Sequence, residues 1–241
     1  MKLKILAADG QGRIKDQWSH GANPSISRTV NIPEEYIQIE YGTLKRKDPS
    51  PVFYDQPYWG VDGHSEIQDQ CFNVHGYKNE AGITKTEAVL KHCKGTTLLE
   101  IGCAPGAFMR RATEVGYSCV GIEPCYEHIK FILDYSGCIV YHGFFEDVEL
   151  TEKFDTIVAM DVLEHVPEPG RFIAKAISML KDGGRIVLML PAIYDDGQFD
   201  ERQFHPEHIH LFSQEHLRKM LNPIIFDRWV VGHEIVVLEP R

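Results

Sequence analysis

A strand-like run followed closely by two glycines has the pattern of a ligand-binding turn. The run is Thr97–Ile101, which includes Glu100, and Gly102 and Gly106 follow it. Residues 108–115 then have the character of a helix that Gly116 can stop. Glycine lets a backbone approach a ligand closely, and the first N–H groups of a helix are free to bind it. The pattern predicts the opening of a nucleotide-binding α/β unit.

Three side chains further along the chain are candidates for acid–base chemistry. Asp161 and His165 follow a predicted buried strand, and His210 follows the next one. Histidine is the natural general base near neutral pH. Two alternatives stay open at this point: His165 can serve packing and loop shape, and Asp161 can bind a substrate hydroxyl or hydrogen-bond its own loop.

A group of histidines raises the question of a metal ion. His205, His208 and His210 are closely spaced, and Glu207 or Asp161 could join them. On a strand, His208 and His210 would share one face, and imidazole and carboxylate groups are common metal ligands. We favour an interpretation without a metal, in which this group supplies a base or a substrate contact.

The elements that must position these residues become regular from Thr84 onward. Thr84-Lys85-Thr86-Glu87 is a capping box that opens a short helix. Apolar runs predict strands over residues 97–101, 118–123, 138–142, 156–160 and 185–191. Intervening helices are predicted from 126 to about 133 and after Glu168, the latter with Phe172, Ile173, Ala176, Ile177 and Leu180 on one face. Ser213 is expected to cap a last helix, and 224–231 with 233–238 to form a closing hairpin.

The turn after Ile101 distinguishes between two cofactor families. The segment Glu100-x-Gly102-x-Ala104-x-Gly106 lacks the third glycine of the dinucleotide pattern G-x-G-x-x-G. It resembles motif I of the class I S-adenosylmethionine-dependent methyltransferases, with Ala104 in place of the middle glycine. The segments 154–166 and 181–191 resemble later motifs of the same superfamily, in the branch of the quinone-biosynthesis, sugar and natural-product O-methyltransferases.

This resemblance implies a Rossmann-like α/β fold with a seven-stranded sheet in the order 3-2-1-4-5-7-6 and helices on both faces. It also implies S-adenosylmethionine as the cofactor. The residues implied for the methionine part are Glu100, which meets the ammonium group, and Gly102, Cys103, Ala104 and Gly106. Glu123 is implied for the ribose, and Met160 for the strand end that faces the sulfonium. Beside the adenine the resemblance implies Pro124, Cys125, Tyr126 and Phe145, with either Glu146 or Asp147 at its edge or backbone groups alone.

The expected reaction is methyl transfer to a small-molecule acceptor, such as a sugar, a quinone precursor or another metabolite. A hydroxyl oxygen is the expected accepting atom, with His165, His210 and Asp161 as the catalytic candidates. The alternatives are N- or C-methylation of a small molecule, or cofactor binding without catalysis. A protein or RNA methyltransferase is not eliminated, whereas the glycine spacing disfavours a nicotinamide-linked enzyme.

Two domains are expected: an N-terminal extension over residues 1–80 and a methyltransferase domain over 81–241. The extension contains Tyr36–Tyr41, which alternates like a strand, and a possible hairpin of 3–8 with 13–18. The extension is rich in aromatic residues. Two roles are open for it: it covers the substrate, with Tyr58 or Trp59 near the ligand, or it packs on the sheet.

Composition limits the classes of partner. The chain has 241 residues and a net charge of −10, and its sequence contains no long basic run. Affinity for nucleic acid rests largely on Lys and Arg contacts to phosphates, so nucleic acid is not an expected partner. No apolar run approaches the roughly 20 residues of a membrane span, and the six cysteines lack C-x-x-C spacing. We therefore expect a cytoplasmic protein with reduced thiols, whose oligomeric state the sequence does not determine.

Overall fold

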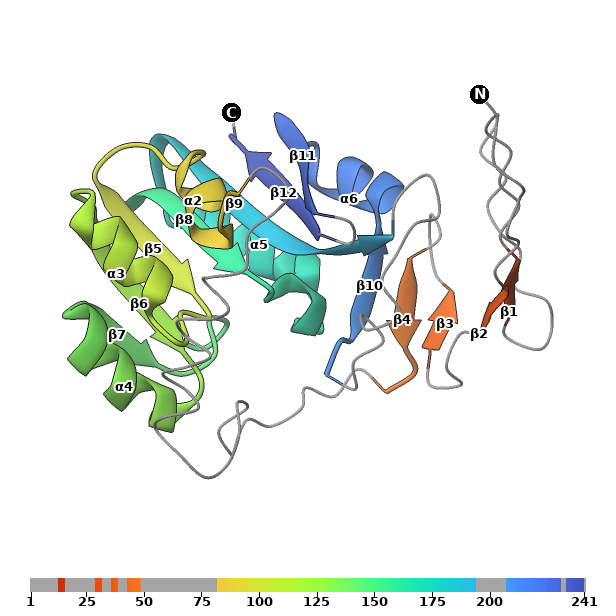
Figure 1. The fold of residues 1–241 in the computed structure, drawn as a ribbon, viewed down its shortest axis with the longest axis horizontal. Coiled ribbons are helices and arrows are strands. Elements are labelled where there is room, and N and C mark those ends of the chain that lie inside the picture. Colours follow the sequence, from red (N-terminus) through yellow and green to blue (C-terminus); the bar gives the residue numbers. More distant parts are fainter. Residues whose placement is uncertain are drawn as a thin grey trace.

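The computed structural model describes residues 13–15, 29–31, 36–38, 43–48, 82–193, 207–230 and 233–240. Its centre is a twisted sheet in the order β7-β6-β5-β8-β9-β12-β11 (Figure 1). The strands are β5 (Thr97–Ile101), β6 (Ser118–Glu123), β7 (Ile139–His142), β8 (Phe154–Met160), β9 (Leu180–Ile193), β11 (Ile225–Val230) and β12 (His233–Leu238). The first five are parallel, and β12 is antiparallel to both of its neighbours. The predicted α/β class and the predicted order 3-2-1-4-5-7-6 are confirmed.

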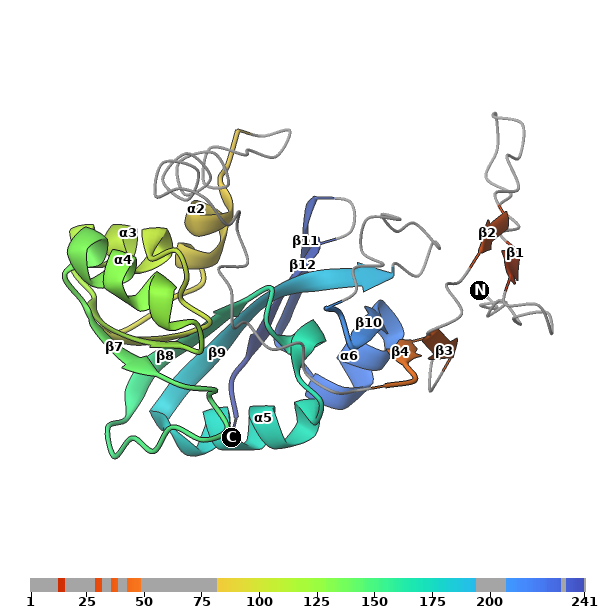
Figure 2. The same cartoon turned by 90° about the horizontal axis from the view of Figure 1, so that it is seen from below.

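Helices cover the sheet on both faces (Figure 2). The helices are α2 (Lys85–Leu90), α3 (Ala107–Glu114), α4 (Tyr126–Ser136), α5 (Pro169–Ser178) and α6 (Gln214–Leu221). Buried residues of α2, α3 and α4 belong to one core cluster, and those of α5 and α6 to the other. The capping box predicted at Thr84 is present: its side chain accepts from the N–H of Glu87, whose side chain accepts from the N–H of Thr84. None of the helices in the described part of the chain has both the length and the apolar character needed to cross a lipid bilayer.

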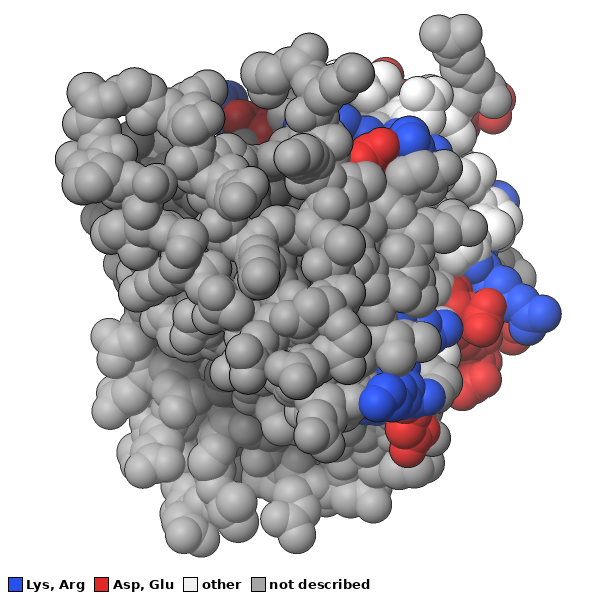
Figure 3. Space-filling model, turned by 90° about the vertical axis from the view of Figure 1, so that its right-hand side faces the viewer, with Lys and Arg blue, Asp and Glu red and all other residues white. Residues whose placement is uncertain are grey.

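The sheet continues beyond the seven strands through a short ladder at the end of β9. Strand β10 (His210–Ser213) runs parallel to the last residues of β9, β4 (Leu44–Arg46) pairs antiparallel with β10, and β3 (Tyr36–Gln38) pairs with β4. The strand predicted at Tyr36–Tyr41 is thus present over Tyr36–Gln38, its remaining residues lie outside the described ones, and β4 was not expected. Figure 3 faces this side, and on the described part of its surface Lys and Arg lie next to Asp and Glu.

Near the N-terminus the structure describes one pair of short strands. Strand β1 (Arg13–Lys15) pairs antiparallel with β2 (Thr29–Asn31). The expected partner, residues 3–8, lies outside the described residues, as do Tyr58 and Trp59.

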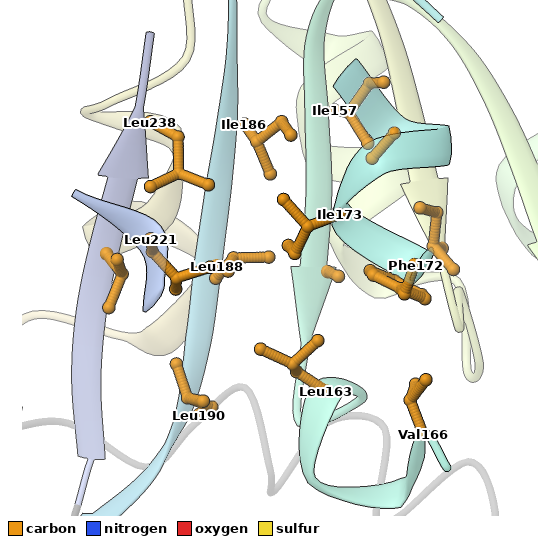
Figure 4. Packing of buried hydrophobic residues seen from close by; sticks show 14 of the residues in the cluster. Ile157, Leu163, Val166, Phe172, Ile173, Ile186, Leu188, Leu190, Leu221 and Leu238 are labelled. Carbon is orange, nitrogen blue, oxygen red and sulfur yellow. The ribbon is translucent and has the colours of Figure 1, made fainter. Parts of the chain in front are cut away.

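Strand β9 shows why the strands are nearly continuous apolar runs. Ile186 and Leu188 point toward α5, near Ile173, whereas Val187 and Met189 belong to the opposite cluster (Figure 4). Side chains of a strand alternate between faces, so a strand covered on both faces must be apolar throughout.

The prediction of an apolar face for the helix after Glu168 is wrong for the last two of its residues, Ile177 and Leu180. Helix α5 ends at Ser178, Ile177 is 40% exposed, and Leu180 already belongs to β9, opposite Phe154. The chain leaves the helix before its next turn because Leu180 pairs with β8, and the pairing register then shifts between Phe154 and Thr156. Gly183, with φ of +70°, lies in the intervening segment.

Asp155 joins the starts of β5 and β8. One of its oxygens, Oδ2, accepts from the N–H of Thr96 at 3.0 Å, from the N–H and hydroxyl of Thr97 at 2.9 and 2.8 Å, and from Lys181 Nζ at 3.1 Å. The backbone donor at Thr96, followed by those of Thr97 and by Lys181, holds the pKa of this carboxyl below its usual range.

We predict that Asp155→Asn lowers the free energy of unfolding at pH 7 by about 1 kcal/mol, because an amide oxygen is a weaker acceptor and the site is partly exposed. The carboxylate stabilises the fold above its unfolded pKa of about 3.9, and this stabilisation is lost as pH falls toward the lower folded pKa. Urea unfolding from pH 7 to 3 should therefore show the parent and the variant converging below about pH 4. Asp182→Asn, at an exposed acid, is the control and should behave like the parent.

Candidate functional site

The turn after β5 is built around two glycines in left-handed conformations. Gly102 has φ of +68° and donates its N–H to the carbonyl of Ile122 at 2.8 Å, which ties the turn to β6. Gly106 has φ of +89° and is the N-cap of α3. An alanine Cβ would lie 2.6 Å from Val162 Cγ2 at position 102. The two glycines therefore allow both the turn and the close approach of neighbouring segments.

Cys103 contributes to this turn through its backbone. Its side chain is 1% exposed, and a Cβ at Gly121 of β6 would lie 2.6 Å from its Sγ. Burial, with the charges of Glu100 and Glu123, raises the pKa of the thiol well above its usual range. The side chain of Cys103 is thus a packing group beneath the turn, and only its main chain is available to a ligand.

Glu123 at the end of β6 joins the turn to the loop that follows β6. Its Oε2 accepts from the N–H of Ala104 at 3.1 Å, and its Oε1 accepts from the N–H of Cys125 at 3.0 Å. The residue is 5% exposed. The carboxylate therefore stands at the shared carboxyl edge of β5 and β6, where open α/β sheets bind their ligands.

Glu100 is the second buried acid of this edge. It is 2% exposed, and its Oε2 has no hydrogen-bond partner among the described residues. Burial, with the nearby charge of Glu123, raises the pKa of the Glu100 carboxyl well above its usual range. An acid in this state is one that a cationic ligand group would stabilise in its ionised form.

The residues expected beside an adenine separate into two groups. The ring of Tyr126 is 55% exposed and lies 5.6 Å from the ring of His142, whose Nε2 is 3.0 Å from the carbonyl oxygen of Pro124. Glu146 is also exposed. The ring of Phe145, in contrast, is 3% exposed and packs edge-to-face on Phe172 in the core. The ring of Phe145 is therefore a packing group in this structure.

Asp161, directly after β8, forms a charged group with two other elements. Lys85 of α2 forms an ion pair with its Oδ2, and His233 Nε2 of β12 lies 3.5 Å from its Oδ1. Burial alone would raise the pKa of this carboxyl, but the Lys85 charge and the hydrogen bond and charge of His233 bring it below its usual range. The backbone φ of +53° is left-handed, a conformation that aspartate tolerates better than most residues.

Glu164, His165 and His208 form the second polar group on this side of the sheet. Glu164 is fully buried, neither of its carboxyl oxygens has a hydrogen-bond partner among the described residues, and burial followed by the charge of Asp161 raises its pKa well above the usual range. His165 Nδ1 lies 3.0 Å from the carbonyl oxygen of Glu207, which makes Nδ1–H the donor, and its ring is 4.9 Å from that of His208.

One potential ligand atom from each of these three residues lies within 4.8 Å of the others, a spacing that a divalent cation could bridge. This donor set differs from the expected one, because it draws Glu164 and His165 to His208 and leaves out His210. His205 lies outside the described residues. The spacing of the histidines could not reveal this group, because its members come from segments more than forty residues apart.

His210 is not part of either polar group. It is 4% exposed, its ring stacks on Phe212 at 5.2 Å, and its strand pairs with Lys45 of β4. Burial, followed by the charge of Lys45, lowers the pKa of His210 to about 4. A base of that strength, enclosed in the ladder beside β9, is poorly suited to accept a proton at neutral pH.

The sheet order, the glycine turn and the acid after β6 together define the fold of a class I S-adenosylmethionine-dependent methyltransferase. The profile of a family described as methyltransferase domain matches residues 74–223, which is more than half of the chain. The chain belongs to this methyltransferase domain family, and its cofactor is S-adenosylmethionine.

Curated relatives and a solved structure agree with this assignment. The chain is 34% identical over 100 residues to a ubiquinone biosynthesis O-methyltransferase of Nitrobacter winogradskyi, covering 37% of this chain and 36% of that protein. It is 30% identical over 125 residues to one of Bradyrhizobium sp., covering 46% and 47%. The chain thus matches less than half the length of these relatives. An S-adenosylmethionine-dependent methyltransferase of Thermotoga maritima superposes with a TM-score of 0.56 at 18% identity, over 74% of this chain and 96% of that one, which supports the fold.

The first site prediction compares two glycines with nearly the same backbone angle. Gly102 has φ of +68° and Gly137, the C-cap of α4, has φ of +69°, but nothing lies within 4 Å of a Cβ at Gly137. Gly137→Ala should cost about 1–2 kcal/mol for the left-handed conformation alone. Gly102→Ala should cost roughly 1–3 kcal/mol more because its Cβ collides with Val162. Urea unfolding measures both. Adding Val162→Ala should recover most of the extra cost at position 102, and no recovery would contradict the packing explanation.

The second site prediction concerns pH. His210 has a folded pKa of about 4 against about 6.5 when unfolded, so the unfolded chain binds the proton more readily. The neutral ring of His210 makes its full contribution to the free energy of unfolding above pH 6.5. This contribution should therefore decrease as pH falls toward 4, by roughly 1–2 kcal/mol between pH 7 and 5. His210→Gln should flatten this slope in urea unfolding, and His142→Gln, at an exposed histidine, should retain it. Equal slopes in the parent and His210→Gln would show that His210 is not buried as a neutral ring.

Proposed function

We propose that this protein transfers a methyl group from S-adenosylmethionine to a hydroxyl oxygen of a small-molecule acceptor. The observation that carries the proposal is the buried Glu123 carboxylate, held between the backbone of the glycine turn and the loop after β6. Support for oxygen as the accepting atom comes from the curated relatives, which are named O-methyltransferases.

On the cofactor side, the proposed roles follow from position and charge. Glu123 accepts the ribose hydroxyls, because a carboxylate can accept further hydrogen bonds besides its two backbone donors. Glu100, through its unpartnered Oε2, meets the ammonium group. The main chain of Gly102, Cys103, Ala104 and Gly106 borders the methionine part. When bound, the cofactor supplies an electrophilic methyl group on a cationic sulfonium.

Pro124, Tyr126 and Glu146 are proposed to border the adenine, together with the backbone of Phe145. Met160, the last residue of β8, is half-buried and marks the strand end on the sulfonium side. These positions support the proposal because all of them lie at or just beyond the carboxyl ends of neighbouring parallel strands.

On the acceptor side, the proposed residues are the polar groups that follow β8. Methyl transfer requires the acceptor oxygen in line with the sulfonium and relieved of its proton. Asp161, held ionised by Lys85 and His233, can hold an acceptor hydroxyl by a hydrogen bond. The proton leaves toward His165, whose Nδ1–H is engaged with a carbonyl, so that its Nε2 carries the lone pair. We leave His210 out of this proposed set because its lowered pKa makes it a weak base.

We also propose the division into an extension over 1–80 and a methyltransferase domain over 81–241. The ladder β3–β4–β10 supports a role of the extension beside the acceptor. Strand β10 begins two residues after His208, and β4 from the extension pairs with it. The extension therefore reaches the segment that carries one member of the acceptor-side group.

The test is calorimetric titration of the full chain with S-adenosylmethionine, after removal of any copurified ligand. The parent should bind, and Glu123→Gln should weaken binding roughly 10- to 100-fold, the value of hydrogen bonds to a charged acceptor. Glu114→Gln, at an exposed acid of α3, should bind like the parent. Transfer of labelled methyl to hydroxylated aromatic and sugar acceptors then tests the reaction. A folded parent that does not bind, or a Glu123→Gln variant that binds equally well, would contradict the proposal.

A further inference from the structure

A buried histidine lies next to the acid of the cofactor site. His128 is in the first turn of α4 and is 3% exposed. Its Nδ1 lies 3.6 Å from Oε1 of Glu123. Neither ring nitrogen has a hydrogen-bond partner among the described residues. Buried polar groups in native proteins nearly always have partners, so an unpartnered ring at this position calls for an explanation.

The position of His128 on its helix connects it to the turn after β5. A Cβ at Gly106 would lie 3.1 Å from Cγ2 of Ile132, so this face of α4 packs against the turn. His128 precedes Ile132 by four residues and therefore lies on the same face, one turn nearer the start of the helix. One face of α4 thus contacts both the glycine turn and, through His128, the Glu123 carboxylate.

The geometry leaves one oxygen of Glu123 with a second donor in reach. Oε2 is bound by the N–H of Ala104, whereas Oε1 accepts from the N–H of Cys125 and also faces His128 Nδ1. At 3.6 Å the imidazole is just outside hydrogen-bond distance, and a small rotation of either side chain closes the gap. Catalytic and binding hydrogen bonds are often longer without the ligand and tighten in the complex.

We propose that His128 is a positioning residue of the cofactor site, which donates Nδ1–H to Glu123 Oε1 and so fixes the carboxylate toward the ribose hydroxyls of S-adenosylmethionine. This inference rests on the proposed role of Glu123. It explains why a histidine whose ring nitrogens have no hydrogen-bond partner among the described residues is retained inside the protein: the bond it needs forms when the carboxylate takes its ligand-binding orientation.

The experiment compares two substitutions of His128 in the full chain by titration with S-adenosylmethionine. Asparagine places an amide N–H near the position of Nδ1, whereas leucine fills the space without a donor. His128→Asn should bind within about threefold of the parent, and His128→Leu about tenfold more weakly, the loss expected for one hydrogen bond to a charged acceptor. Leu133→Ala, at an exposed position of the same helix, is the control and should bind like the parent.

A second background separates positioning from packing. If His128 acts through Glu123, His128→Leu should add less than a twofold loss when Glu123 is already glutamine. Its urea midpoint should also stay at or above that of the parent, because leucine removes two buried polar atoms. An equal loss in both backgrounds, equally weak binding by the asparagine and leucine variants, or parental affinity in His128→Leu would overturn the inference.

The same data distinguish this inference from the proposed function. If Glu123→Gln alone binds like the parent, the cofactor role of Glu123 fails and the role of His128 fails with it. If Glu123→Gln weakens binding and His128→Leu does not, only the role of His128 is overturned.

Discussion

The carboxyl edge of β5 and β6 depends on one buried carboxylate. Glu123 accepts a backbone N–H from the turn after β5 and another from the loop after β6. A buried carboxylate is costly unless it is hydrogen-bonded, so both loops must present their amides to it. This requirement holds the two loops close to each other. Beneath the turn, the absence of a side chain at Gly121 leaves room for Cys103.

Beyond the end of β8, charged side chains from distant parts of the chain lie in contact. Asp161 follows β8, Lys85 belongs to α2 and His233 to β12. Close by, the main-chain carbonyl of the fully buried Glu164 accepts a hydrogen bond from the N–H of Ile209 at 2.8 Å, which holds the segment with His208 against the segment with His165. The Asp161 group is therefore held by contacts between charged side chains, whereas the segments with His165 and His208 are joined by a backbone hydrogen bond.

The ladder at the end of β9 gives the extension a structural connection to this edge. Thr43 contributes two contacts: its hydroxyl accepts from the N–H of Ser213 at 2.9 Å and lies 2.9 Å from Nδ1 of His216. The cap of α6 is thus bound to a residue of the extension. Strand β10 therefore connects β4 and Thr43 to the segment that carries His208.

The sequence by itself determined the features that depend on local chemistry. Glycines at 102 and 106 predict the turn, the Thr84 box predicts the start of α2, and apolar runs predict strands covered on both faces. With the resemblance, these gave the sheet order and the family. Only the tertiary structure decided where individual side chains point and what they meet. The ring of His210 is buried against Phe212. Ile177 was expected on the apolar face of its helix but is exposed, and α4 brings His128 beside Glu123. The physical reason is that strand pairing and helix ends set the direction of each side chain, and both depend on contacts between segments that are far apart in the chain.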